Sequence, residues 1–236
     1  MSNNLLLSPD SSRVSREELQ YIPTPPATAT WKPVPHYDIA SLIVNEAEER
    51  GYCILSEEYG LNKSMTQLFG VLRCHPMGHP EFSRCLGLRN SHDKSLAVGL
   101  TAGVSVLVCE NLCFGGETTI HRKHTSGICI EEMIPGAFDD LLSQYQKLEA
   151  NIEILRERKI SLNDARITVA KAAEIKAIPS CDVVPVLDEF KQPRHQEFAH
   201  YNRWNLYNAF TEIAKKYTPA RVDRCYRKLG QLFNLI

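Results

Sequence analysis

The chain has 236 residues, of which 43% are hydrophobic and 23% are charged, a composition typical of a globular protein that buries a core. It has no apolar run of about 18 residues, and its start, MSNNLLLSPD, has neither a charged nor a long apolar segment. The sequence therefore predicts no membrane span and no secretory signal, and favours a cytoplasmic protein. The eight cysteines are scattered along the chain, which favours reduced, mostly buried thiols over a disulfide framework.

Charge is distributed unevenly, although the net charge is only −1. From Lys191 to Ile236 there are nine basic and three acidic residues, so this segment carries +6 and the rest of the chain −7. Tyrosine and tryptophan lie among these basic residues, at Tyr201, Trp204, Tyr207, Tyr217 and Tyr226. This pattern favours a surface that follows a nucleic-acid backbone and stacks bases. The alternative is a solvated helix face that balances an acidic body.

Residues 1–35 are predicted to form an extended arm. Five prolines and several small polar residues lie between Ser11 and Pro35, and they exclude a helix or a central strand there. Apolar residues then recur at helical spacing from His36 to Arg50. Asp38 is the candidate N-cap of this helix and Gly51 its candidate stop.

The next part of the chain is predicted to be rich in strands. Tyr52–Ser56, Met65–Cys74 and Phe82–Ser91 alternate with turn residues and suggest a meander. Asp93–Gly103 is expected to be either a short helix or a wide connection. Val104–Leu112 is the clearest strand, because its apolar, β-branched run suits a strand covered on both faces.

Beyond Pro135 the pattern becomes helical. An apolar stripe from Phe138 to Leu155 predicts a long amphipathic helix, which could serve the core or the assembly of a homo-oligomer. Ser161 and Asp164 form a capping box that opens a second helix, to about Lys176. Further helices are predicted over Val183–Phe190, Phe198–Tyr217 and Pro219–Phe233.

Together these elements predict an α+β fold with one domain over residues 36–236. An antiparallel or mixed sheet, in a β-β-β-α-β-like order, would occupy residues 36–130 and pack with a helical half over residues 131–236.

A polar turn follows the third predicted strand. It gathers hydrogen-bond donors beside apolar strands, at Arg89, Asn90, Ser91, His92 and Lys94. Such a turn can grip a phosphate or a base edge. Alternatively, its side chains satisfy the backbone of an Asx or Ser turn.

Two loose clusters of cysteine and histidine are candidate zinc sites: Cys74, His75, His79 and Cys85, and Cys109, Cys113, His121, His124 and Cys129. Their spacing matches no common zinc site and neither contains a CxxC pair, so core thiols and surface imidazoles are the expected roles. No nucleotide-binding fingerprint is present, and no metal or cofactor is expected.

Four motifs give the chain a resemblance to a known family. They are NSHDKS from Asn90, VCENL from Val108, HRKH from His121 and NRWNLYNAFTE from Asn202. In this order they are similar to the phage- and plasmid-borne family named domain of unknown function 932. The resemblance covers most of the chain and implies a mobile-element context.

Three functions are consistent with these observations. The first is a nucleic-acid-binding accessory protein of a mobile element, similar to single-strand annealing proteins, that binds single-stranded nucleic acid. Its phosphate contacts would be Arg89, Lys94, Arg122 and Lys123, and its C-terminal contacts Arg203, Trp204 and Tyr207. The second is a protein that binds a host defence protein through its helical half. The third is an enzyme built around His92, Asp93, Cys109 and Asn111.

Overall fold

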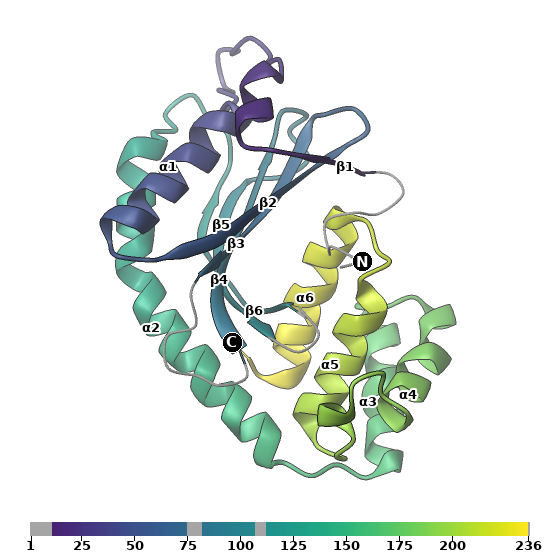
Figure 1. Cartoon of the computed structure of the whole chain (residues 1–236). Helices are drawn as coiled ribbons and strands as arrows, with labels where there is room; N and C mark the ends of the chain where they lie inside the picture. Colours follow the sequence, from purple (N-terminus) through teal and green to yellow (C-terminus); the bar gives the residue numbers. More distant parts are fainter. Residues whose placement is uncertain (1–10, 75–81, 107–111, 236) are drawn as a thin grey trace.

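The computed structural model describes residues 11–74, 82–106 and 112–235. An antiparallel sheet is followed along the chain by a helical half, which confirms the predicted α+β class (Figure 1). Among the described residues, no helix has both the length and the apolarity needed to cross a bilayer.

The sheet has six strands in the order in which they occur along the chain. All neighbouring strands are antiparallel. The strands are β1 (Ser11–Val14), β2 (Ile54–Asn62), β3 (Gln67–Cys74), β4 (Phe82–Ser91), β5 (Val98–Val106) and β6 (Leu112–Arg122).

The predicted β-β-β-α-β order is wrong, because the described chain between β4 and β6 forms a strand and no helix. Val98, Leu100, Ala102 and Val104 alternate along β5 and are buried, which is the period of a strand. Gly99 has a separate reason to be glycine: a Cβ there would lie 2.8 Å from Nε of Arg89. The end of the predicted strand Val104–Leu112 falls partly on residues 107–111, outside the described residues.

The predicted arm supplies a strand of the sheet. β1 pairs with the second half of β2, from Ser11 opposite Asn62 to Val14 opposite Tyr59. A 3₁₀ turn, η1 (Glu17–Tyr21), follows it. Four residues are too short for a periodicity signal, and the prolines lie beyond them.

The helical part begins with α1 (His36–Glu49) and continues after the sheet with α2 (Ile130–Glu157), α3 (Leu162–Glu174), α4 (Val183–Lys191), α5 (Arg203–Ala214) and α6 (Pro219–Phe233), with two short 3₁₀ turns, η2 (Ser180–Asp182) and η3 (Gln196–Phe198). In Figure 1, α1 and α2 lie on one side of the curved sheet, and α5 and α6 lie on the other.

Two hydrophobic clusters follow from this arrangement. Consecutive residues of β4 belong to different clusters. Leu86 packs with α1 and the first half of α2, whereas Cys85 packs with the second half of α2, α5 and α6. The apolar stripe of α2 runs through both, from Phe138 in the first cluster to Leu155 in the second. Apart from Leu142, which is 52% exposed, the stripe is therefore core.

Some of the predicted helix ends agree with the structure. Ser161 Oγ accepts a hydrogen bond from Asp164 N at 3.0 Å, so the predicted N-cap of α3 is confirmed, while the Asp164 carboxylate accepts from Ser161 Oγ at 2.6 Å rather than from the Ser161 backbone. Gly51 follows α1 with φ of +81°, as a helix stop requires. The N-cap predicted at Asp38 is wrong, because α1 already begins at His36, with Pro35 in the cap position.

Candidate functional site

The polar turn after β4 is mostly buried. Asn90 and Ser91 are fully buried and His92 nearly so. Asn90 Nδ2 donates to the Val34 carbonyl at 2.7 Å and to His36 Nδ1 at 3.0 Å. His92 Nε2 donates to the same Val34 carbonyl at 2.9 Å. These side chains bind the arm, so their donors are not open to a phosphate.

The rest of the turn matches the structural alternative. Ser91 Oγ donates to the Leu96 carbonyl at 2.9 Å and accepts from Leu96 N at 3.0 Å. Asp93 accepts from Ser95 N at 2.9 Å and from the side chains of Thr66 at 3.0 Å and Gln67 at 3.1 Å. Partial burial raises the pKa of the Asp93 carboxyl, but these hydrogen bonds together outweigh it and leave the pKa lowered. An Asx turn therefore accounts for these groups.

The predicted phosphate contacts have different surroundings. Lys94 lies 4.9 Å above the Trp31 ring, and Lys123 is exposed. Arg89 is buried and its side chain lies against Gly99. Of Arg122 only the backbone is described.

The predicted stacking residues lie in the core. Trp204 and Tyr207 are 4% and 0% exposed and stack on each other, with ring centroids 5.6 Å apart. Arg203 is half-buried 5.3 Å from the Phe233 ring, and desolvation lowers its pKa. A stacking role for Trp204 and Tyr207 does not fit this burial, since neither ring offers an open face to a base.

A group of neutral histidines lies where the arm meets the sheet. His36 and His92 stack with centroids 3.8 Å apart and planes 5° apart, and His124 is close enough to influence both electrostatically. Burial, and then the neighbouring His92, lower the pKa of His36 to about 3. Burial is also the main cause that lowers the pKa of His92 and of His124. All three rings are therefore neutral at pH 7.

Among the described residues, no group of three or more His, Cys, Asp or Glu is placed to hold a metal ion. Several members of the candidate metal and enzyme sets lie outside the described residues: His75, His79, Cys109 and Asn111. Only the backbone of His121 is described.

Four of the nine cations of the basic C-terminal segment are paired with carboxylates. Lys191 pairs with Asp188, Lys216 with Asp182, and both Arg194 and Lys215 with Glu212; Arg194 also pairs with Glu189. These pairs neutralise the region around α4 and α5. A polyanion would therefore encounter less positive charge there than the count of basic residues suggests.

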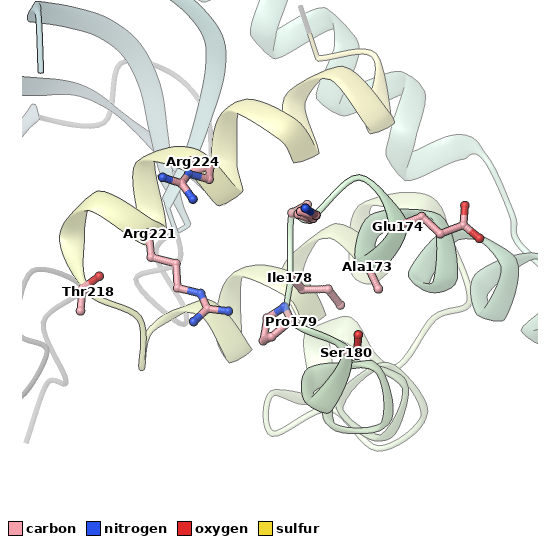
Figure 2. Close-up of a pocket in the computed structure, with 10 residues that line it drawn as sticks. Ala173, Glu174, Ile178, Pro179, Ser180, Thr218, Arg221 and Arg224 are labelled. Atoms are coloured by element: carbon pink, nitrogen blue, oxygen red, sulfur yellow. The ribbon is translucent and has the colours of Figure 1, made fainter. Parts of the chain in front are cut away.

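The basic end of α6 is different. An open groove of about 610 Å³ lies between α6 and the loop after α3 (Figure 2). It is lined by Ala173, Glu174, Lys176, Ala177, Ile178, Pro179, Ser180, Thr218, Arg221 and Arg224. We call it the α3–α6 groove.

Three cations line the α3–α6 groove. Arg221 lies 4.6 Å from the Tyr217 ring, which supports its guanidinium without neutralising it. Arg224 and Lys176 are exposed, and none of the three has a carboxylate ion pair among the described residues. Glu174 also lines the groove, but Figure 2 shows its carboxylate pointing away from both guanidinium groups.

Local structure fixes the two walls of this groove. Arg221 and Arg224 are three residues apart, so they share one face of α6. On the opposite wall, Lys176 has φ of 59° directly after α3, and Lys228 Nζ donates to the Ile175 carbonyl and, at 3.5 Å, to that of Lys176. The chain thus tethers the loop to α6.

Sequence reasoning missed this groove as a site. Arg221 and Arg224 were counted in the basic segment, but Lys176 is 45 positions before Arg221 and only the fold brings it near. The i, i+3 spacing of the two arginines was the available signal.

Residues 47–232 match the model of the family described as Domain of unknown function (DUF932). No curated protein and no solved structure matches the chain significantly.

Proposed function

The chain belongs to the family described as Domain of unknown function (DUF932), and from this premise we propose that it binds single-stranded nucleic acid through the α3–α6 groove. The observation that carries the proposal is the set of cations in that groove, Lys176, Arg221 and Arg224, which have no carboxylate ion pair among the described residues. Cations in an open groove are the feature that phosphate backbones require.

The other lining residues suit a nucleic acid better than a small anion. The hydroxyl groups of Ser180 and Thr218 add polar contacts of the kind that proteins make to phosphate and sugar. Pro179 gives the groove a half-exposed apolar wall, and Ala177 and Ile178 line it too, although each is only 3% exposed. Such a wall suits the base faces that a single strand exposes and a duplex hides.

The biological setting is part of the same proposal. The family resemblance supports an accessory role in a phage or plasmid, and such a role would place the protein in the cytoplasm. The proposed binding site lies at α6 rather than at the turn after β4, because the turn uses its donors to hold the arm.

The test is fluorescence anisotropy with a labelled single-stranded oligonucleotide over a salt series. We expect affinity to fall steeply with salt. The combined variant Lys176→Ala, Arg221→Ala, Arg224→Ala should lose most of the affinity. It should also flatten the slope of log K against log salt by about 2, because each phosphate that a cation neutralises contributes about 0.7 to that slope.

A matched control removes the same charge elsewhere, with Lys147→Ala, Arg158→Ala and Lys159→Ala on and after α2. This control should keep at least a third of the affinity. A second control, Lys94→Ala with Lys123→Ala, tests the turn first predicted. Equal losses in the groove variant and the charge-matched control would reject the groove, and absence of binding at low salt would reject the function.

A further inference from the structure

We propose that the contact between the arm and the sheet is a proton-sensitive latch, in which uptake of a proton by His36 releases residues 31–36 from the end of β4. This inference concerns a different part of the molecule from the α3–α6 groove and does not depend on nucleic-acid binding.

The arm is held at two places. Beside β6, Trp31 forms an isolated bridge with Thr125, and Lys32 N donates to the His124 carbonyl at 3.2 Å. At the end of β4, the Val34 carbonyl accepts one hydrogen bond from Asn90 and one from His92. The second place depends on side chains whose hydrogen-bonding roles a proton can change.

The roles of the Asn90 amide are fixed by its neighbours. One of its two hydrogens goes to the Val34 carbonyl, and the other goes to His36 Nδ1. Nδ1 of His36 must therefore be the unprotonated nitrogen, because two donors cannot share one hydrogen bond. A proton added to His36 goes to Nδ1 and places two donors face to face.

Turning the amide over does not remove this conflict. The Oδ1 atom of Asn90 could accept from a protonated His36, but this acceptor would then face the Val34 carbonyl, a second acceptor, to which only His92 would still donate. Either arrangement loses a hydrogen bond at a residue that is 0% exposed. A buried polar group left without its partner costs about 1–3 kcal/mol.

The other polar atoms near the latch offer no hydrogen bond of good geometry that would stabilise a protonated His36. Nε2 of His36, Oδ1 of Asn90 and both ring nitrogens of His124 are buried and have no hydrogen-bond partner among the described residues. The backbone of Met65 raises the pKa of His36 and that of Lys32 raises the pKa of His124, but neither contact meets hydrogen-bond geometry and burial outweighs both.

The charges around His36 also act on its protonation. His92, which follows β4, stacks on its ring, and together with His124 beyond β6 it lowers the pKa of His36. Asp93 in the turn favours protonation but is the smallest influence. Lys94 lies over Trp31 and adds positive charge to the same region, while Lys32 is tethered to the Ile128 carbonyl.

The direction of the pH effect follows from the lowered pKa. The pKa of His36 is about 3 when the arm is docked and near 6.5 when the ring is free. The docked state is thus fully favoured above about pH 6.5 and weakens as pH falls. Below about pH 6.5, the equilibrium constant for release of the arm rises by up to about tenfold per pH unit for each proton that is taken up on release.

Hydrogen exchange measured by mass spectrometry at pH 7.5, 6.0 and 5.0 tests the latch in the full-length protein, after correction for the intrinsic rate at each pH. We expect peptides that cover residues 31–37 to lose at least tenfold of their protection between pH 7.5 and 5.0. Peptides from α5 should keep theirs, since release of the arm leaves the helical half folded.

The decisive variant is His36→Asn, whose Oδ1 can accept from Asn90 where Nδ1 did but cannot take up a proton in this range. It should keep the arm protected to pH 5.0, whereas the exposed control His200→Asn should behave as the wild type does.

Two results with the wild type alone would overturn the latch, whether or not His36→Asn folds. One is an arm equally protected at pH 5.0 and 7.5. The other is simultaneous loss of protection in the arm and α5, which would indicate global unfolding. Loss of arm protection in a folded His36→Asn variant, at the same pH as in the wild type, would also overturn it.

Discussion

The end of β4 and the basic end of α6 both present polar and cationic side chains, and the structure uses them in opposite ways. At β4, Asn90 and His92 are buried and donate to the backbone of the arm. At α6, Arg221 and Arg224 are exposed and line an open groove.

This difference shows what distinguishes a structural polar residue from a candidate for binding. A buried donor that already has a protein acceptor stabilises the fold, and removing it destabilises the chain. An exposed cation without a carboxylate partner contributes little to the fold and remains available to a ligand. Changes at the two places should therefore affect different measurements.

The largest effect is expected from charge reversal in the groove. Arg221→Glu with Arg224→Glu should lower the affinity for single-stranded DNA at least a hundredfold at 50 mM salt, because two attractive contacts become repulsive. The free energy of unfolding should change by less than about 1 kcal/mol. Anisotropy and urea denaturation measure the two quantities, and an affinity within threefold of the wild type would contradict the prediction.

Asn90→Ala should show the opposite pattern. It removes two buried hydrogen bonds and leaves the acceptor at His36 Nδ1 unsatisfied, so we expect the free energy of unfolding to fall by about 2–4 kcal/mol. Urea denaturation measures this loss. The exposed Asn163→Ala should change it by less than about 0.5 kcal/mol. A similar small change for Asn90→Ala would mean that the arm contact contributes little to the fold.

Lowering the pH should weaken the contact between the arm and β4 without any mutation. The pKa of His36 is lowered to about 3 by burial, so its stabilising contribution is complete above pH 6.5 and is lost as pH falls. Between pH 7.5 and 5.0 we expect a loss of about 2 kcal/mol from this residue, at about 1.4 kcal/mol per pH unit below 6.5. Urea denaturation at both pH values checks this, with His36→Asn as the variant that should lose less.

The smallest expected effect is the difference in stability between variants of two helix caps. Ser161 accepts a capping hydrogen bond at 3.0 Å, and Ser161→Ala should cost about 1 kcal/mol. Thr218 occupies the cap position of α6 but its side chain accepts no capping bond among the described residues, so Thr218→Ala should cost less than about 0.5 kcal/mol. Thermal unfolding of the two variants measures the difference, and an equal cost would show that cap geometry does not decide it.

Periodicity predicted the long helices well because local sequence determines them. The stripe from Phe138 to Leu155 lies inside α2, and the predicted N-cap Ser161 opens α3. The strand β5 was missed because Gly99 and Gly103 interrupt its apolar alternation, and only pairing with β4 and β6 makes it a strand.

The site was harder to predict, because composition gives the number of charges but not their partners. Arg194 and Lys215 counted towards a basic surface, yet both pair with Glu212 once the helices are packed. Trp204 and Tyr207 suggested a stacking surface, but burial in the core explains them instead. Lys176 could not be assigned to a groove until α3 and α6 were placed together.

The order of the strands also bears on how the chain is made. From β2 onwards each strand pairs with the strand that precedes it along the chain, so this part of the sheet can form hairpin by hairpin as the chain is synthesised, whereas η1 and α1 lie between β1 and β2. The face of the sheet lined by Val104 and Cys113 stays uncovered until α5 and α6 follow. Because α6 both covers this face and carries Arg221 and Arg224, a chain that stops before Pro219 lacks the cover and the cations together.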